Sequence, residues 1–541
     1  MDIAENKIAV IIRKTDATAC NLCVESLQEL KLPDGFEAEI ILINNSDSPA
    51  KLYNRAMREN IAKYKIYIDE HIAVLDENIL CDVVELFEKE PDIGAIGVVG
   101  SLQLPTGGLA AQGKNSYGKV LDGKTGESIE ILPLNKELLA KAEHETFVDV
   151  QAVDRYFIAT QYDIDWREDL FDDETCLDSS QSIEFKRAGY RVVTLKREKA
   201  SIAVMQDNNK VKEINVNKFL DEYSKDIYPL VSIVIPTYNR PQLFKEALDS
   251  VIVQDYRNLD IFITDNSHNE LTKDLMKSYI KKYPNIKYEH HPDFDAMGNW
   301  VRAKEYNNPE AEYVNWLMDD DLFMPNKISV MVDAFMYYPD VNLVTSNRTA
   351  INIDGDIIKA GSMVKEDTKV PGKQAGKKIV LEMNNWIGEP TTALVRKSAM
   401  LNNSLGYKSN FDVYFISDYP TWLRVLSTGN LIYLKEQLSC FRVHSNQDTN
   451  SFGTKVALFF MMAKAIKYAQ DDGYYLESWQ EIYTAYTAVI QWAASMPRLF
   501  QGIHENAPEK DIVRRVMLAY VDALFNGGNL VLPAEILRKV K

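Results

Sequence analysis

The chain has 541 residues, of which 46% are hydrophobic and 26% charged, and its formal net charge is −18. The length predicts about three domains, and the apolar content excludes collagen-like, low-complexity and fully disordered chains. The acidic balance argues against a protein that binds nucleic acid, because such a protein needs a basic surface. It does not exclude a small anionic ligand that a metal ion brings into an acidic site.

No transmembrane segment is expected from the sequence. The most apolar run, residues 456–466, is too short to cross a bilayer and contains Lys464. The N-terminal segment has two acidic residues before its first apolar run, the reverse of the order in a signal peptide. Five scattered cysteines do not suggest a disulfide framework, which favours a reducing compartment. We therefore expect a cytoplasmic protein, with attachment to a membrane surface left open.

Residues 1–206 form the first predicted domain. Apolar runs at residues 7–12, 39–43 and 65–68 have the composition of strands, and helical patterns separate them. Alternating strands and helices predict an α/β fold with an open, mostly parallel, Rossmann-like sheet. Such a sheet binds its ligands at the carboxyl ends of its strands.

The next segment, residues 207–228, is polar and charge-rich, which predicts a linker with a short helix. The alternation of strands and helices then returns over residues 229–450. Its first strand, residues 231–235, is stopped by Pro236, and Pro241 suits the first turn of the helix that follows. Further strands are predicted at residues 260–264, 286–289 and 313–318.

The two halves also match near their ends. Asp178 stands eleven residues before Gly189, and Asp418 stands eleven before Gly429, each time in a helix-then-strand segment. This repeat predicts two tandem copies of one fold. Residues 451–541 show helical periodicity alone, which predicts a helical C-terminal region through which the chain could form a homo-oligomer.

Three adjacent carboxylates, Asp319, Asp320 and Asp321, follow an apolar strand and precede Pro325. Because such carboxylates repel one another, a fold that gathers them normally supplies a cation. Oxygen ligands favour Mg²⁺ or Mn²⁺, with positions left for phosphate oxygens. A solvated acidic turn is the alternative, but the preceding strand and the following proline favour the metal site.

With these motifs in chain order, the second copy resembles an inverting family 2 glycosyltransferase of the GT-A fold. The resemblance extends over about residues 229–451. The shared motifs lie at residues 231–241, 264–267, 298–300, 319–321, 387–391, 416–419 and 441–444. One of them alone would be a weak signal, but their common order makes the resemblance specific.

The resemblance implies a set of residues that bind the nucleotide-sugar donor: Pro236, Thr237, Tyr238, Asn239, Asp265, Asn299, Asp319 and Asp320. Among them, Asp265 is implied to hydrogen-bond the edge of uracil or thymine. Asp321 is implied as the direct ligand of Mn²⁺ or Mg²⁺. His444 matches a late histidine that completes this site in some members, and a structural imidazole is the alternative.

Asp418 matches the family's catalytic base, although the usual Glu-Asp pair is here Ser417-Asp418. An acceptor hydroxyl has a very high pKa, so a carboxylate must take its proton as it attacks. An aspartate that only caps the start of a helix is the alternative. The resemblance also implies that Trp386, Glu389 and Pro390 face the acceptor.

The first copy resembles another branch of the same superfamily, in residues 48–54 and in the strand that leads to Asp69. Asp69, Glu70 and His71 stand where a DxD-type pair is expected, and the Pro-Thr-Tyr-Asn loop is missing. Asp and His can both bind a metal. The first copy is therefore expected to be a diverged scaffold or a glycan-binding domain, with a second active transferase as the alternative.

The resemblance implies a metal-dependent transferase that moves a sugar from a UDP- or dTDP-sugar to a hydroxyl group. The acceptor would be a glycan, a lipid-linked oligosaccharide or a protein, in bacterial surface glycan or glycoprotein synthesis. A sugar nucleotidyltransferase would need a Gly-rich basic loop after its first strand, and neither copy has one. A non-catalytic protein that binds nucleotide-sugars or glycans, and a bifunctional transferase, remain the alternatives.

Overall fold

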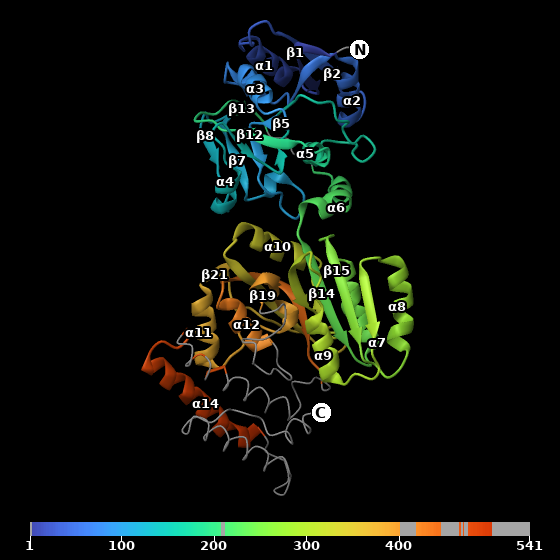
Figure 1. The fold of residues 1–541 in the computed structure, drawn as a ribbon, viewed down its shortest axis with the longest axis vertical. Coiled ribbons are helices and arrows are strands. Elements are labelled where there is room, and N and C mark those ends of the chain that lie inside the picture. The colour runs from blue at the N-terminus through green and yellow to red at the C-terminus, as the bar shows by residue number, and fades with distance from the viewer. Residues whose placement is uncertain are drawn as a thin grey trace. The chain divides into compact units, whose positions relative to one another are not determined.

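The computed structural model describes residues 3–206, 211–400, 418–444 and 474–499, together with residues 465, 466 and 469. Contacts divide the chain into two compact units (Figure 1). The first unit comprises Met1–Tyr228 and Met336–Pro339, and the second comprises Pro229–Phe335 and Asp340–Lys541. Both units combine helices with sheets, which confirms the α/β class and the tandem arrangement predicted from the sequence.

The first unit contains two sheets and their helices. In chain order its elements are β1 (Ala4–Lys14), α1 (Ala17–Gln28), β2 (Glu37–Asn44), α2 (Pro49–Glu59), β3 (Ala62–Ile68), β4 (Ile72–Val74), α3 (Ile79–Lys89), β5 (Ile93–Gly97), β6 (Val99–Ser101), η1 (Ala110–Gln112), β7 (Ser116–Asp122), β8 (Ser128–Ile131), α4 (Lys136–Ala142), β9 (Phe147–Asp149), β10 (Ala152–Val153), β11 (Phe157–Thr160), α5 (Leu177–Arg187), β12 (Arg191–Leu195), β13 (Ile202–Val204) and α6 (Glu213–Ile227).

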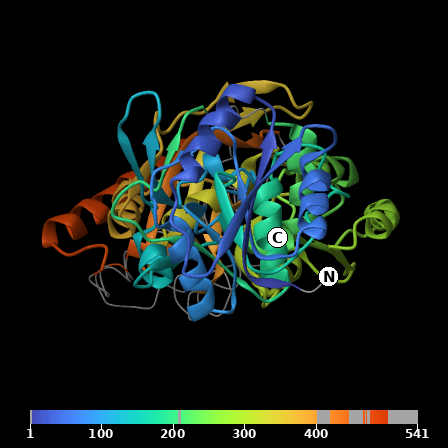
Figure 2. The same ribbon diagram turned by 90° about the horizontal axis from the view of Figure 1, so that it is seen from above.

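The larger sheet of the first unit has the strand order β2-β1-β3-β11-β5-β12-β9. Strand β1 is parallel to both of its neighbours, with Ile12 opposite Leu42 of β2 and Ile68 of β3. Helices lie on both sides of these strands (Figure 2). Residues 8–12 of β1 are buried throughout, as expected for a parallel strand covered on both faces.

The segment predicted as a linker with a short helix contains a helix at residues 213–227. They form helix α6, whose Phe219 and Tyr223 are completely buried within the first unit. Arg187 of α5 forms ion pairs with Glu222 and Asp226 of α6. The composition did not reveal that this helix is buried. Its charged residues outnumber its two large aromatic residues, Phe219 and Tyr223, which are spaced four apart.

The second unit is built on a ten-stranded sheet. Its elements are β14 (Leu230–Thr237), α7 (Pro241–Ile252), β15 (Leu259–Asp265), α8 (Leu271–Lys282), β16 (Ile286–His290), α9 (Ala296–Glu305), β17 (Ala311–Trp316), β18 (Leu322–Phe323), α10 (Lys327–Tyr337), β19 (Val341–Ile351), β20 (Ile357–Ala360), β21 (Thr368–Val370), α11 (Gly372–Glu382), η2 (Pro390–Thr392), β22 (Leu394–Arg396), η3 (Lys397–Ala399), α12 (Asp418–Leu426), β23 (Asn430–Arg442) and α14 (Trp479–Leu499).

The parallel strands β16, β15, β14 and β17 are neighbours in this sheet. The register pairs Thr237 at the end of β14 with Asp265 at the end of β15, and Val234 with Trp316 of β17. The loops that follow β14, β15 and β17 therefore leave the sheet at one edge. This edge carries the polar motifs that the sequence places after strands.

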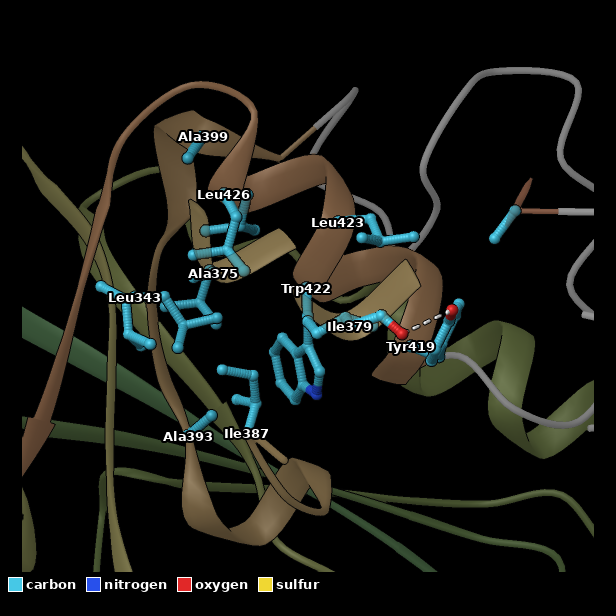
Figure 3. Packing of buried hydrophobic residues seen from close by; sticks show 14 of the residues in the cluster. Leu343, Ala375, Ile379, Ile387, Ala393, Ala399, Tyr419, Trp422, Leu423 and Leu426 are labelled. Carbon is cyan, nitrogen blue, oxygen red and sulfur yellow. Dashed lines mark hydrogen bonds between the residues drawn. The ribbon is translucent and has the colours of Figure 1, made fainter. Parts of the chain in front are cut away.

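The core beside this edge holds helix α12 in place (Figure 3). The indole of Trp422 is completely buried, and its Nε1 donates a hydrogen bond of 3.0 Å to the backbone oxygen of Gly388. Tyr419 donates a bond of 3.4 Å to the backbone oxygen of Ile379 on α11. Because both anchors lie in the first turns of α12, they fix the position of Asp418, the first residue of the helix.

Most of the predicted helical C-terminal region lies outside the described residues. Within it, the structure describes helix α14, which packs against α11 through ion pairs of Lys377 with Glu477 and Glu481. Among the described helices, none is long and apolar enough to cross a membrane.

Candidate functional site

The loop after β14 is tied to the acidic triplet that follows β17. The Thr237 hydroxyl donates a 2.9 Å hydrogen bond to Oδ2 of Asp319, and the backbone N–H of Tyr238 donates one of 3.3 Å to the same oxygen. Asp319 thus shapes the start of the loop. Pro236, the residue before Thr237, is buried inside β14.

Tyr238 and Asn239 connect this loop to the loop after β15. Asn239 adopts a left-handed conformation with φ 51°, and its N–H donates to the hydroxyl of Ser267 at 2.7 Å. Its side-chain oxygen accepts from the backbone N–H of His268 at 3.2 Å. The ring of Tyr238 is 44% exposed and lies edge-on to His268. The two loops form one polar rim with an accessible aromatic ring.

Asp265 and Asn299 lie beneath this rim. Asp265 has no exposed surface, and its carboxylate accepts from the N–H of Ser267 at 2.8 Å and from the hydroxyl of Tyr288 at 2.7 Å. Asn299 is also buried and bonds the backbone oxygen of Thr237 at 3.2 Å. In this geometry both side chains support the loops rather than present polar atoms to a ligand, which differs from the donor contacts implied by the sequence.

The three carboxylates of residues 319–321 have different surroundings. Burial and the charge of Asp320 raise the pKa of Asp319 to about 7. Asp321 is 1% exposed, and its two oxygens accept hydrogen bonds from the Thr391 hydroxyl at 2.7 Å and from the Arg442 N–H at 2.9 Å. Burial raises the pKa of the Asp321 carboxyl well above its usual range.

Asp320 is the member of the triplet that meets His444. The His444 Nε2 lies 3.0 Å from Oδ2 of Asp320, and Nη1 of Arg240 lies 3.1 Å from the same oxygen. The structure therefore places the predicted metal-binding histidine against Asp320 and not against Asp321. Asp321 is buried with both oxygens hydrogen-bonded to the protein, and its role as the direct metal ligand stays a prediction.

Arg442 is a buried residue that the sequence analysis did not single out. Its guanidinium donates to the backbone oxygen of Asp320 at 2.7 Å and forms an ion pair with Glu246 at 2.6 Å. Together with its N–H bond to Asp321, these contacts anchor the triplet to β23. A fully buried arginine has to be paired with acceptors. The signal for Arg442 in the sequence was its position two residues before the candidate ligand His444.

Asp418 lies in a second acidic group at the site. Its Oδ2 accepts a hydrogen bond of 2.7 Å from the side-chain amide of Asn385. Burial, together with the charge of Glu389, raises the pKa of Asp418 to about 6. The charge of Glu389 also acts on Asp321. Glu389 thus stands near both acidic groups, which brings Asp418 and the triplet to the same region of the second unit.

The three residues expected to face an acceptor have separate positions. Glu389 forms an ion pair with Arg348 at 2.9 Å. Pro390 begins the short helix η2, and its backbone oxygen accepts a 2.8 Å bond from Asn315. Trp386 is only 8% exposed and stacks on Tyr433 within the hydrophobic core. The ring of Trp386 thus packs inward, and its contact with an acceptor stays a prediction.

Within the described part of the chain, no group of three or more His, Cys, Asp and Glu side chains is arranged to hold a metal ion. A metal bound at Asp320 and His444 would thus need further ligands from a bound molecule. Arg240 pairs with Asp319 at 3.4 Å and with Asp320 at 3.1 Å, so its guanidinium offsets part of the negative charge of the two adjacent carboxylates. The donor set of one carboxylate and one imidazole fits a divalent metal of the Mn²⁺ kind.

Two family models match this chain. Residues 232–402 match the model described as Glycosyl transferase family 2, and residues 9–223 match one described as Glycosyltransferase like family. The range 9–223 falls within the first unit, and the family 2 range, which falls almost entirely within the second, takes in the loop after β14 and the acidic triplet.

Similar sequences come from bacteria. An uncharacterized glycosyltransferase of Rickettsia typhi is 26% identical over 231 residues, which cover 41% of this chain and 67% of the relative. The GalNAc(5)-diNAcBac-PP-undecaprenol beta-1,3-glucosyltransferase of Campylobacter jejuni is 27% identical over 104 residues, 19% of this chain and 34% of the relative. Among solved structures, S. aureus TarS 1–349 in complex with UDP-GlcNAc covers 57% of this chain and 82% of its own, at 15% identity and a TM-score of 0.39.

Proposed function

Since the chain is a glycosyltransferase with a family 2 domain preceded by a second, family 2-like domain, we propose that its second unit transfers a sugar from a UDP- or dTDP-sugar to a hydroxyl group. The reaction inverts the anomeric carbon. The observation that carries this proposal is the grouping of the Asp320–His444 pair, the loop after β14 and the raised-pKa carboxylate of Asp418 in one unit.

The donor nucleotide lies on the rim formed by the loops after β14 and β15. The exposed ring of Tyr238 offers a face on which the base stacks, and the Asn239–Ser267 bond keeps the two loops together. Asp265 positions this rim from below through Ser267 and Tyr288. Asp319 holds the loop after β14 through its hydrogen bond with Thr237. It therefore organises the donor site although its own side chain is buried.

Asp320 and His444 hold a divalent metal when the donor is bound. Mn²⁺ or Mg²⁺ at this position supplies positive charge to the diphosphate as it leaves. Asp321 supports the pair from behind, since its carboxylate fixes the backbone of Arg442 and the side chain of Thr391. Arg240 provides a second positive charge on the same side of Asp320.

Asp418 acts as the general base. Its ionised carboxylate takes the proton of the acceptor hydroxyl, the hydroxyl oxygen forms a bond to the anomeric carbon, and the bond from that carbon to the nucleoside diphosphate breaks. Asn385 orients the carboxylate by its 2.7 Å bond. A pKa of about 6 leaves Asp418 ionised near neutral pH and closer to the acceptor's pKa than an ordinary aspartate would be.

The acceptor is a glycan, a lipid-linked oligosaccharide or a protein-linked sugar. Support comes from the Campylobacter jejuni relative, whose name describes transfer to an undecaprenol-linked oligosaccharide, although that relative is matched over only 34% of its length. Glu389, whose charge acts on Asp418, contacts the acceptor together with its ion-pair partner Arg348.

Nucleotide release tests the proposal. The full chain is incubated with UDP-GlcNAc, UDP-glucose, UDP-galactose, UDP-GalNAc and dTDP-rhamnose, with and without Mn²⁺, and the liberated diphosphate is measured. We expect Mn²⁺-dependent release from one donor, loss of release in Asp418→Asn, and full release in Asp274→Asn, a control on the exposed face of α8. Thermal stabilisation by a donor without any release would instead identify a non-catalytic binding protein. The absence of both would refute the proposal.

A further inference from the structure

The first unit contains a cavity of about 360 Å³ at the carboxyl ends of β1 and β3. This volume is near the lower end of the ~300–1,000 Å³ typical of small-molecule sites, so it suits one or two sugar rings better than a complete nucleotide-sugar. Its walls contain charged groups from several elements and three large aromatic side chains. None of these residues takes part in the site of the second unit.

The cavity occupies the place that corresponds to the donor site of the second unit. The backbone N–H groups of Thr15 and Asp16 donate to the carboxylate of Glu70, at 2.9 and 3.1 Å, and the Thr15 hydroxyl donates to it as well. Asp319 binds Thr237 and Tyr238 in the same way. By this match, His71 in the first unit corresponds to Asp320 in the second.

The charges around the cavity are already matched. Asp69 accepts from Nδ1 of His71 at 2.9 Å and lies 3.4 Å from Arg155, which also faces Glu174 at 3.5 Å. Arg13 forms an ion pair with Glu174. The guanidinium of Arg155 thus lies beside the carboxylate of Asp69, which would otherwise be available to bind a metal ion.

A diphosphate is disfavoured in these surroundings. Five carboxylates line the cavity against two arginines, one histidine and no lysine. The two arginines are engaged by Asp69 and Glu174, so an entering anion would have to break these pairs or accept the repulsion of the carboxylates. A neutral ligand keeps every pair intact and can still bond to the remaining lone pairs and N–H groups.

The aromatic residues favour a ligand with an apolar face. The ring of Trp166 lies 4.9 Å from the rings of Tyr53 and Tyr67, and all three line the cavity. Trp166 is 3% exposed and its indole interacts with the Tyr67 hydroxyl, so it contributes its ring, and not a free N–H, to the cavity wall. Sugar rings combine C–H faces that pack on aromatic rings with hydroxyls that bond to carboxylate and guanidinium groups.

We infer that the first unit is a binding site for a neutral sugar residue, which it holds without a nucleotide or a metal ion. Glu174, Arg155 and the Tyr53 hydroxyl bond its hydroxyl groups, and the rings of Tyr53 and Trp166 contact its ring. No bond of the sugar is made or broken there. The inference rests on the geometry of the first unit alone and stands whether or not the second unit is a transferase.

Ligand-observed NMR on the full chain tests this site. The probes are the methyl glycosides of glucose, galactose, mannose, N-acetylglucosamine and N-acetylgalactosamine, and UDP with Mn²⁺. We expect saturation transfer to at least one glycoside, with a dissociation constant in the millimolar range. Glu174→Gln should weaken it by about tenfold, because the arginines lose a shared partner, and Tyr53→Phe by several-fold through loss of one hydroxyl. Glu85→Gln, on the exposed face of α3, is the control.

Two further comparisons decide where the probes bind. Asp320→Asn should leave glycoside binding unchanged, whereas its loss in that variant would place the glycoside in the second unit and overturn the inference. The inference is equally overturned if no glycoside binds, if binding survives in both pocket variants, or if UDP with Mn²⁺ is the probe that these variants release. Should Glu174→Gln fail to fold by circular dichroism, Tyr53→Phe alone decides, since it removes a single oxygen atom.

Discussion

The carboxylate of Asp418 accepts a hydrogen bond from Asn385, which favours its charged form, yet its pKa is raised to about 6. Burial of the carboxylate and the nearby charge of Glu389 outweigh the hydrogen bonds. Burial and the charge of Glu389 make the ionised form of Asp418 costly for the stability of the protein. By raising its pKa, they also make Asp418 a better proton acceptor. A helix-capping aspartate on the surface would have neither property.

The rate of transfer should therefore depend on pH through Asp418. The base works only when ionised, so kcat should be constant above its pKa of about 6 and fall about tenfold for each pH unit below it. Asp418→Asn should lower kcat by ~100–10,000-fold and abolish this acidic limb, while the KM for the donor changes little. A wild-type profile that stays flat down to pH 4.5 would assign proton removal to another group.

Asp320 and Asp321 are adjacent but should respond differently to substitution. Asp320→Asn removes a charge beside His444 and should eliminate thermal stabilisation by UDP plus Mn²⁺, with little change in the Tm of the free protein. Asp321→Ala leaves the Thr391 hydroxyl and the Arg442 N–H without their acceptor, at about 1–3 kcal/mol for each buried group. It should lower the Tm of the free protein by several degrees. The reverse pattern would restore Asp321 as the metal ligand.

Helix α12 connects the hydrophobic core to the catalytic carboxylate. Trp422 lies one turn after Asp418, so their side chains share a face of the helix. The bond from Trp422 Nε1 to Gly388 ties α12 to the segment that carries Glu389. The position of the base thus depends on packing that lies outside the site (Figure 3).

Trp422→Phe tests this dependence. The change removes the bond to Gly388 and part of the buried indole, which should cost about 1–3 kcal/mol of stability and lower kcat more than it alters the donor KM. Trp479→Phe is the matched control because Trp479 is 79% exposed. Guanidinium unfolding and steady-state kinetics measure the two effects. An unchanged kcat in a destabilised Trp422→Phe variant would show that α12 tolerates movement without loss of catalysis.

Local patterns were sufficient to predict the strands and the loops that follow them. The apolar run before Pro236 and its counterpart before Asp319 form β14 and β17, because buried parallel strands consist of such runs. The sequence could not separate Asp320 from Asp321, because they are neighbours and their difference arises from Thr391 and Arg442, 70 and 121 residues away. The stacking of Trp386 on Tyr433 could not be predicted for the same reason, since Tyr433 lies on a distant strand.

The two units share one arrangement of loop and carboxylate but differ in the charged groups around it. In both, a carboxylate after a central parallel strand binds the loop after the first strand, through Glu70 in one unit and Asp319 in the other. In the first unit an arginine, Arg155, stands beside Asp69, so positive charge is permanently present. In the second unit carboxylates crowd together, and Asp319 has a pKa raised to about 7. Arg240 likewise pairs with Asp319 and Asp320 in the second unit, so the units differ chiefly in the next residue, which is His71 in the first unit and the additional oxygen ligand Asp320 in the second.

This difference predicts which unit responds to the donor nucleotide. On addition of UDP and Mn²⁺ to the full chain, amide hydrogen exchange should slow in peptides that cover residues 237–240, 266–268 and 319–322, because the ligand orders the loops at that edge. Peptides that cover residues 13–16 and 69–71 should exchange at unchanged rates, since an entering diphosphate would have to break the ion pairs of Arg13 and Arg155 with Glu174 and Asp69. Protection of both sets, with separate dependence on UDP concentration, would mean that the chain has two donor sites and that each unit can work as a transferase.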